Sequence, residues 1–128
     1  MGQKINPIGF RVGITKAWDA KWFANKRNFA KILHQDLAIR KVIADKLKEA
    51  GVSKVEIIRN ANQVTLNIHS SRPGIAIGSQ GAAIESLRKD LESRFHDRFN
   101  VNIKEIKKPY SDAYILAEMV VKQIEKRI

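Results

Sequence analysis

The sequence contains no cysteine and no long uninterrupted run of apolar residues. The first absence excludes disulfides, thiolate chemistry and cysteine-based zinc sites, and it is typical of proteins in a reducing cytosol. The second excludes a membrane-spanning helix, which needs about 20 predominantly apolar residues. The sequence therefore predicts no membrane partner.

Histidine is scarce as well, and the three histidines match no metal-ligand spacing: His34, His69 and His96. Three acids on the first predicted helix are interpreted as charges on its solvated face, not as an acid–base pair: Asp36, Asp45 and Glu49. The segment GIAIGSQG matches neither a dinucleotide-binding loop nor a Walker loop. We therefore expect no enzyme activity, no metal, no cofactor and no small-molecule substrate.

Positive charge is abundant: 24 lysines and arginines stand against 13 acids, for a net charge of +11. A solvated surface alone rarely needs so large an excess in 14.5 kDa, so the expected partner is anionic, either a polymer or a membrane surface, and of these two we expect the polymer. The charge is densest in residues 1–27, which hold one acid, Asp19, and six basic residues: Lys4, Arg11, Lys16, Lys21, Lys26 and Arg27.

Residues 1–27 show no helical or strand periodicity, and aromatic residues lie among the basic ones: Phe10, Trp18, Trp22 and Phe23. This composition suits a basic N-terminal arm that folds against RNA, with cations on phosphates and rings stacking on bases. The alternative is that the aromatic rings dock the arm on its own domain. Both can hold at once.

From residue 28 onward the hydrophobic pattern predicts alternating helices and strands. Asn28 is expected to cap the first helix, and Ser111-Asp112 the last one, whose apolar side holds Ala113, Leu116, Val120 and Ile124. The predicted order is a helix over 28–50, a hairpin turning at 60–62, a short segment in 74–78, a helix over 82–99, a strand from 101 and a final helix from 111.

Gly78-Ser79-Gln80-Gly81 forms a G-x-x-G loop between two predicted helical segments. Two glycines allow a tight turn with positive φ, and their missing β-carbons let a phosphate backbone approach closely. The next helix then offers free N–H groups and a partial positive charge to an anion. Alone, such a loop is more often a plain helix-turn-helix corner.

The order α-β-β-α-α-β with G-x-x-G between consecutive helices resembles a KH type II domain, whose loop clamps about four nucleotides. The resemblance implies an α+β fold with a three-stranded sheet and helices packed on one face. We expect a basic arm over 1–27, the KH domain over 28–108, and a linker with a trailing helix over 109–128.

The stretches MGQKINPIGFRVG, ANQVTLNIHSSRPGIAIG and GAAIESLRKDL resemble the bacterial ribosomal protein S-three family. This resemblance implies an RNA-binding component of the small-subunit head that contacts the 3′ region of the ribosomal RNA and neighbouring head proteins. Messenger RNA, which enters nearby, is a further candidate partner. The implied location is a cytoplasmic ribosome, with an organellar ribosome as the open alternative. The implied RNA contacts are Gly78, Ser79, Gln80, Gly81, Arg72, Lys4, Arg11 and Lys16.

The chain departs from that family in two ways. Ser79 stands where the family commonly has lysine, which removes one phosphate contact from the loop. The family also continues past the last helix into another α/β domain, so a truncated or naturally short form is expected. The alternatives are a free-standing KH module for single-stranded RNA or DNA and, less favoured, a lysine-based nucleic-acid lyase, for which no lysine has suitably apolar surroundings.

Overall fold

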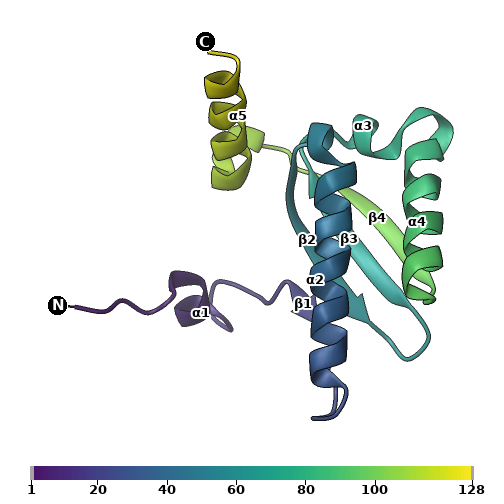
Figure 1. Cartoon of the computed structure of the whole chain (residues 1–128). Coiled ribbons are helices and arrows are strands. Elements are labelled where there is room, and N and C mark those ends of the chain that lie inside the picture. The colour runs from purple at the N-terminus through teal and green to yellow at the C-terminus, as the bar shows by residue number, and fades with distance from the viewer. Residues whose placement is uncertain (1, 128) are drawn as a thin grey trace.

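The computed structural model describes residues 2–127 (Figure 1). It contains an α+β domain with the N-terminal arm and the C-terminal helix on the same side, the helix above the arm in this view. The elements are α1 (Pro7–Arg11), β1 (Ala20–Lys21), α2 (Phe29–Lys46), β2 (Val52–Arg59), β3 (Val64–Ser70), α3 (Pro73–Ile77), α4 (Ala82–Phe95), β4 (Phe99–Glu105) and α5 (Ala113–Glu125), with 3₁₀ turns η1 (Lys48–Ala50), η2 (Ser79–Gly81) and η3 (Pro109–Ser111).

The sheet has the strand order β1-β2-β3-β4. The predicted hairpin is β2–β3, which is antiparallel, whereas β4 lies parallel to β3. Leu66 marks the centre, because it pairs with Ile57 on one side and Val101 on the other. These are the three expected strands of the KH sheet. A fourth strand, β1, comes from the arm and pairs parallel to β2 through two residues. Two residues are too few to show the alternating pattern from which a strand is predicted.

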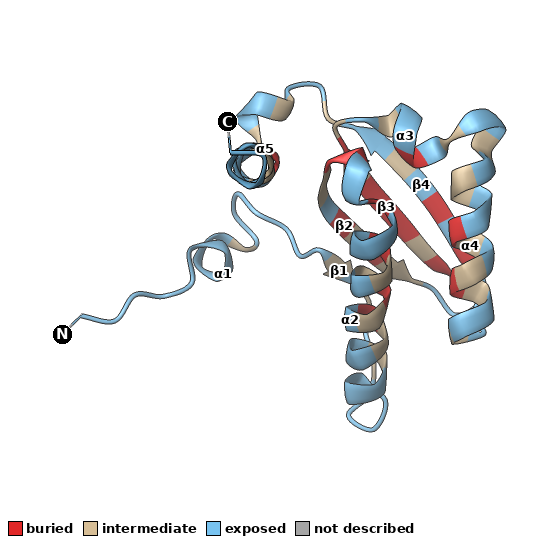
Figure 2. Cartoon of the chain, turned by 45° about the horizontal axis from the view of Figure 1, so that its top comes forward, coloured by how far each residue is buried: buried red, intermediate tan, exposed pale blue. Residues whose placement is uncertain are grey.

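Helices α2 and α4 cover one face of the sheet, and the apolar core lies between them and the strands (Figure 2). Alternate residues of each strand point into this core, as the period-two pattern predicts. The most deeply buried side chains come from α2, α4 and the two central strands: Ile39, Ile43, Leu91, Ile57, Leu66 and Ile68.

Three expected helix boundaries differ in the structure. The first helix, predicted over 28–50, ends as α2 at Lys46, and the 3₁₀ turn η1 follows it. Asn28 makes no side-chain cap at α2; instead the side chain of Asn25 accepts a 3.0 Å hydrogen bond from the Asn28 N–H. Helix α4 ends at Phe95 rather than at residue 99, because His96 takes a left-handed conformation with φ 58°. Strand β4 accordingly starts at Phe99, two residues earlier than predicted, with Phe99 buried beside Val64.

The expected cap of the last helix is present. Asp112 accepts hydrogen bonds from the N–H groups of Tyr114 and Ile115, at 3.0 and 3.2 Å. The Ser53 hydroxyl of β2 donates to the same carboxylate at 2.5 Å, which ties α5 to the sheet and lowers the pKa of Asp112. Packing differs from the expected pattern: Ile115 is the buried residue of α5, and the predicted apolar side at Leu116, Val120 and Ile124 is exposed.

Within residues 2–127, no helix combines the length and the apolar character that crossing a bilayer requires.

Candidate nucleic-acid interface

The glycine loop joins α3 to α4 at the end of the domain where β3 finishes (Figure 1). Three of its four residues have positive φ: Gly78 at 77°, Gln80 at 53° and Gly81 at 76°. Ser79 and Gln80 are exposed at the tip. The four predicted loop residues therefore form one tight, solvent-facing turn, in which Gln80 holds a left-handed conformation unusual for a residue with a side chain.

The two glycines do different things. A β-carbon at Gly78 would lie 2.7 Å from the Ala83 β-carbon and 2.9 Å from the Ala83 nitrogen, so the loop can pack on α4 only if residue 78 has no side chain. A β-carbon at Gly81 would meet nothing within 4 Å. Gly78 is therefore required by packing, and Gly81 leaves open space through which a ligand backbone can approach.

The N-terminus of α4 is open to an anion. Gly81 occupies the N-cap position and no side chain caps the helix. Glu85, the acid in the first turn, is engaged by Arg88, whose Nη2 lies 2.6 Å from Oε2, and this hydrogen bond lowers the pKa of Glu85. A phosphate at this end would meet backbone N–H groups and the positive end of the helix dipole.

Arg72 lies at the other end of α3 from the loop, as the residue before Pro73. Its Nη1 donates to the Glu49 carbonyl at 3.4 Å, and the side chain is exposed. The structure thus places Arg72 beside η1, one short helix away from Gly78.

The three arm cations, Lys4, Arg11 and Lys16, are exposed. The arm around α1 lies on the opposite side of the domain from α4 in both views (Figures 1 and 2). Arg11 closes α1 by donating to the Pro7 carbonyl at 2.9 Å. The predicted contacts therefore fall on two separate surfaces, one around the glycine loop and one along the arm.

Trp22 shows how the arm is attached. Its indole Nε1 donates to Asp36 Oδ2 at 2.6 Å, and its ring lies 5.4 Å from that of Phe29. Trp18 and Phe23, by contrast, are 67% and 95% exposed. The docking alternative is confirmed for Trp22, whereas stacking of the exposed rings on RNA stays a prediction.

Asp36 corrects the expectation of a solvated carboxylate, since it is 3% exposed. Besides Trp22, it accepts a 2.9 Å hydrogen bond from Nε of Arg59 and is ion-paired with that guanidinium. Asp45 and Glu49 are exposed, as predicted. Among residues 2–127, no group of three or more acids and histidines is arranged to hold a metal ion.

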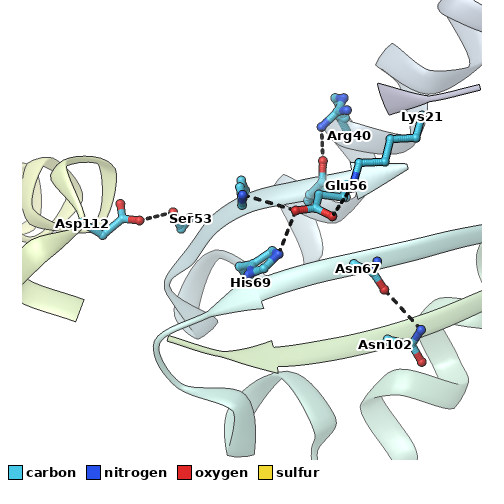
Figure 3. Close-up of polar contacts among 10 residues, drawn as sticks. Lys21, Arg40, Ser53, Glu56, Asn67, His69, Asn102 and Asp112 are labelled. Atoms are coloured by element: carbon cyan, nitrogen blue, oxygen red, sulfur yellow. Dashed lines mark hydrogen bonds and ion pairs between the residues drawn. The ribbon is translucent and has the colours of Figure 1, made fainter. Parts of the chain in front are cut away.

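Sequence reasoning missed a polar cluster on the sheet face turned away from α2 and α4 (Figure 3). Glu56 lies there between Lys54 at 3.2 Å and His69 at 3.2 Å, with Lys21 of the arm at 3.9 Å. Burial alone would raise the pKa of Glu56, but the Lys54 hydrogen bond and the surrounding positive charges outweigh it and lower the pKa. The period-two pattern that locates the core also places these residues together on the opposite face.

Comparison with known proteins agrees with this architecture. The chain is 52% identical over its whole length to small ribosomal subunit protein uS3 of Pelotomaculum thermopropionicum, and it covers 55% of that protein. It is also 52% identical to uS3 of Carboxydothermus hydrogenoformans, covering 58%, and 46% identical to uS3 of Anaeromyxobacter dehalogenans, covering 57%. The chain thus spans little more than half the length of these relatives, and the resemblance to the bacterial S-three family is confirmed.

A family model described as "KH domain" matches residues 38–111, more than half of the chain. The matched segment contains the β2–β3 hairpin, the α3–loop–α4 corner and the parallel strand β4. The expected α+β fold of KH type II is thereby confirmed, and the chain belongs to the KH domain family.

Proposed function

We propose that this chain is a structural RNA-binding part of the small ribosomal subunit head, contacting the 3′ region of the small-subunit ribosomal RNA near the messenger RNA entry side. One observation carries the proposal: similarity along the whole of this chain to proteins named small ribosomal subunit protein uS3 coincides with an exposed glycine loop at an uncapped helix N-terminus. The role is non-catalytic, and its setting is a bacterial-type ribosome in the cytoplasm.

Two surfaces contact the RNA in this proposal, the glycine loop and the arm. The loop residues Gly78 to Gly81 hold one strand through backbone amides, because Ser79 supplies no charge. The arm contributes cations at Lys4, Arg11 and Lys16, which are exposed and make no ion pair within residues 2–127. Arg72 adds a phosphate contact beside α3. Neighbouring head proteins and messenger RNA are further partners.

A free-standing KH module for single-stranded nucleic acid is the second candidate. The observation that favours it is the loop itself, whose positive-φ turn packs on α4 of the same domain at Ala83 and whose tip residues are exposed. Such a module would bind an unstructured strand as tightly as a folded RNA.

Affinity for two RNAs across a salt series separates these functions. One RNA is a folded head-domain fragment of small-subunit ribosomal RNA, and the other is an unstructured strand of equal length. We expect preferential binding of the folded fragment that persists at high salt, with a log–log slope of about −4 to −7 for roughly 4–8 neutralised phosphates. Equal affinities that disappear together as salt rises would refute the ribosomal role.

A further inference from the structure

A second groove lies at the end of the domain opposite the glycine loop. It encloses about 920 Å³ between the hairpin turn, the first turns of α2 and the segment that follows α4. In Figure 1 this is the lower end, where β2 turns into β3 and α4 finishes. The strand register also brings the hairpin turn and the end of α4 together, because Val64 at the start of β3 pairs with Phe99 at the start of β4. No residue of the glycine loop contributes to this groove.

Amide side chains make up half of the polar and charged residues in the lining: Asn28, Gln35, Asn60, Asn62 and Gln63. Amides in a fixed groove can donate to and accept from the edges of unpaired bases. Of these five, Gln35 is engaged, donating to Asp97 at 2.9 Å. Asn60 and Asn62 belong to the exposed turn and keep their side chains available to a ligand.

An aromatic ring completes the groove. Phe23 lines it and is 95% exposed, although the adjacent Trp22 is docked against Phe29 and Asp36. Leaving a phenyl group in water forfeits the gain from burying it, which is about 2 kcal/mol or more. A ring held beside a polar groove is a stacking platform for a base, worth about 1–3 kcal/mol per base.

The rim is positively charged. Lys31 and Arg94 belong to the lining, and Lys26, Arg27 and Arg98 adjoin it in sequence. Within residues 2–127, Lys31 makes no ion pair, whereas Arg59 is neutralised by Asp36 and Arg94 lies 3.2 Å from Asp90. Asp97, the acid of the lining, accepts a hydrogen bond from Gln35, a neutral donor that leaves its charge in place, so the lining carries one carboxylate beside its basic residues. One unpaired lysine in the lining, further basic residues adjoining it in sequence, amides and an exposed ring match an anionic polymer whose bases are unpaired.

We propose that this groove is a second RNA-binding site, which takes an unpaired loop or bulge by stacking on Phe23, with phosphates on Lys31 and base edges on the 60–63 turn. The inference rests on the proposed function in that the ligand is RNA. It adds a site that the KH loop does not provide, so one RNA fold can be held at both ends of the domain.

The test uses the full chain with a head-domain fragment of small-subunit ribosomal RNA as the probe. Phe23→Ala and Lys31→Glu each change an exposed side chain, so folding should survive and an unchanged Tm confirms it. Lys41→Glu, an exposed position farther along α2, is the control with the same charge change outside the groove. Phe23→Ala should weaken binding about tenfold with little change in salt slope. Lys31→Glu should weaken RNA binding and make the salt slope shallower by about 1. Lys41→Glu should change both the affinity and the slope far less.

A perfectly paired RNA duplex should compete poorly in wild type, since it offers no unpaired base. Wild-type affinity in both groove variants overturns the inference and points to a protein neighbour, while the proposed function stands if arm and loop variants still lose binding. Equal losses in Lys31→Glu and Lys41→Glu also overturn it, because generic electrostatics then suffices. If the wild-type chain fails to bind the fragment, the proposed function and the inference fall together.

Discussion

The indole nitrogen of Trp22 and the carboxylate of Asp36 are joined by a 2.6 Å hydrogen bond that links the arm to α2. The same carboxylate holds Arg59 from the end of β2, so three parts of the chain meet at one buried acid. This contact fixes the end of the arm while residues 2–18 extend away from the domain (Figure 1).

Removing that acid should destabilise the fold. Asp36→Ala leaves the Arg59 guanidinium, whose side chain is 12% exposed, without its ion partner, and we expect a loss of about 3 kcal/mol in the free energy of unfolding. Urea denaturation measures it. Asp45→Ala on the same helix is exposed and should change stability by less than about 0.5 kcal/mol. Similar losses in both variants would contradict the assigned contact.

The two loop glycines should respond differently to the same substitution. Gly78→Ala forces a β-carbon against Ala83 at positive φ and should cost about 3 kcal/mol. Gly81→Ala meets open space and should cost about 1 kcal/mol from its backbone conformation alone. Chemical denaturation of both variants checks the order, and a larger cost at Gly81 would show that the loop is packed differently.

Restoring a cation at the loop tip should strengthen RNA binding. Ser79→Lys places an ammonium group next to the open N-terminus of α4, and we expect about fivefold tighter binding of the head-domain fragment with a salt slope steeper by about 1. Titration at three salt concentrations measures both. Ser93→Lys, at an exposed position near the far end of α4, is the control. An equal gain in RNA affinity in this variant would mean that only net charge matters.

The arm should contribute more to RNA affinity than the loop. Deleting residues 2–16 removes Lys4, Arg11 and Lys16 but keeps Trp22 and its docking contact. We expect at least a tenfold loss, with the salt slope shallower by about 2 to 3. The double variant Ser79→Asp/Gln80→Asp changes the exposed loop tip without the clash that a side chain at Gly78 creates, and it should cost about threefold. The reverse order would overturn this division.

Acid should weaken the polar cluster on the open face of the sheet. Because the pKa of Glu56 is lowered from its ordinary value of 4.5, its stabilising effect is complete above that value and disappears as pH falls through the lowered pKa. Glu56→Gln should therefore be less stable than wild type at pH 7, and the difference should shrink below about pH 4.5. Thermal unfolding from pH 7 to pH 3 checks this, with exposed Glu105→Gln as control. A constant difference across that range would contradict it.

The elements with long periodic patterns were predictable from sequence. Ile39 and Ile43 on α2 and Leu66 and Ile68 on β3 form the core as their spacing indicates. The glycine loop was predictable because glycine adopts the positive φ values found at positions 78 and 81 more readily than any other residue.

Features that depend on distant partners were not predictable. Asp36 looks like any other acid on a helix until Arg59, 23 residues away, is placed against it. Strand β1 exists only because β2 offers an edge, and the early end of α4 depends on Phe99 entering the core. The exposed side of α5 shows that a helical pattern predicts a helix but not what covers it.

The parallel pairing of β3 with β4 has a consequence for how the chain folds. The β2–β3 hairpin closes through residues 60–63, whereas β4 can join only after residues 71–98, with both helices and the glycine loop, have been brought back along the sheet. Closing the longer segment costs more entropy and slows pairing. We therefore expect the hairpin to form early and the α3–loop–α4 corner to reach its final shape last, at the step that completes the sheet.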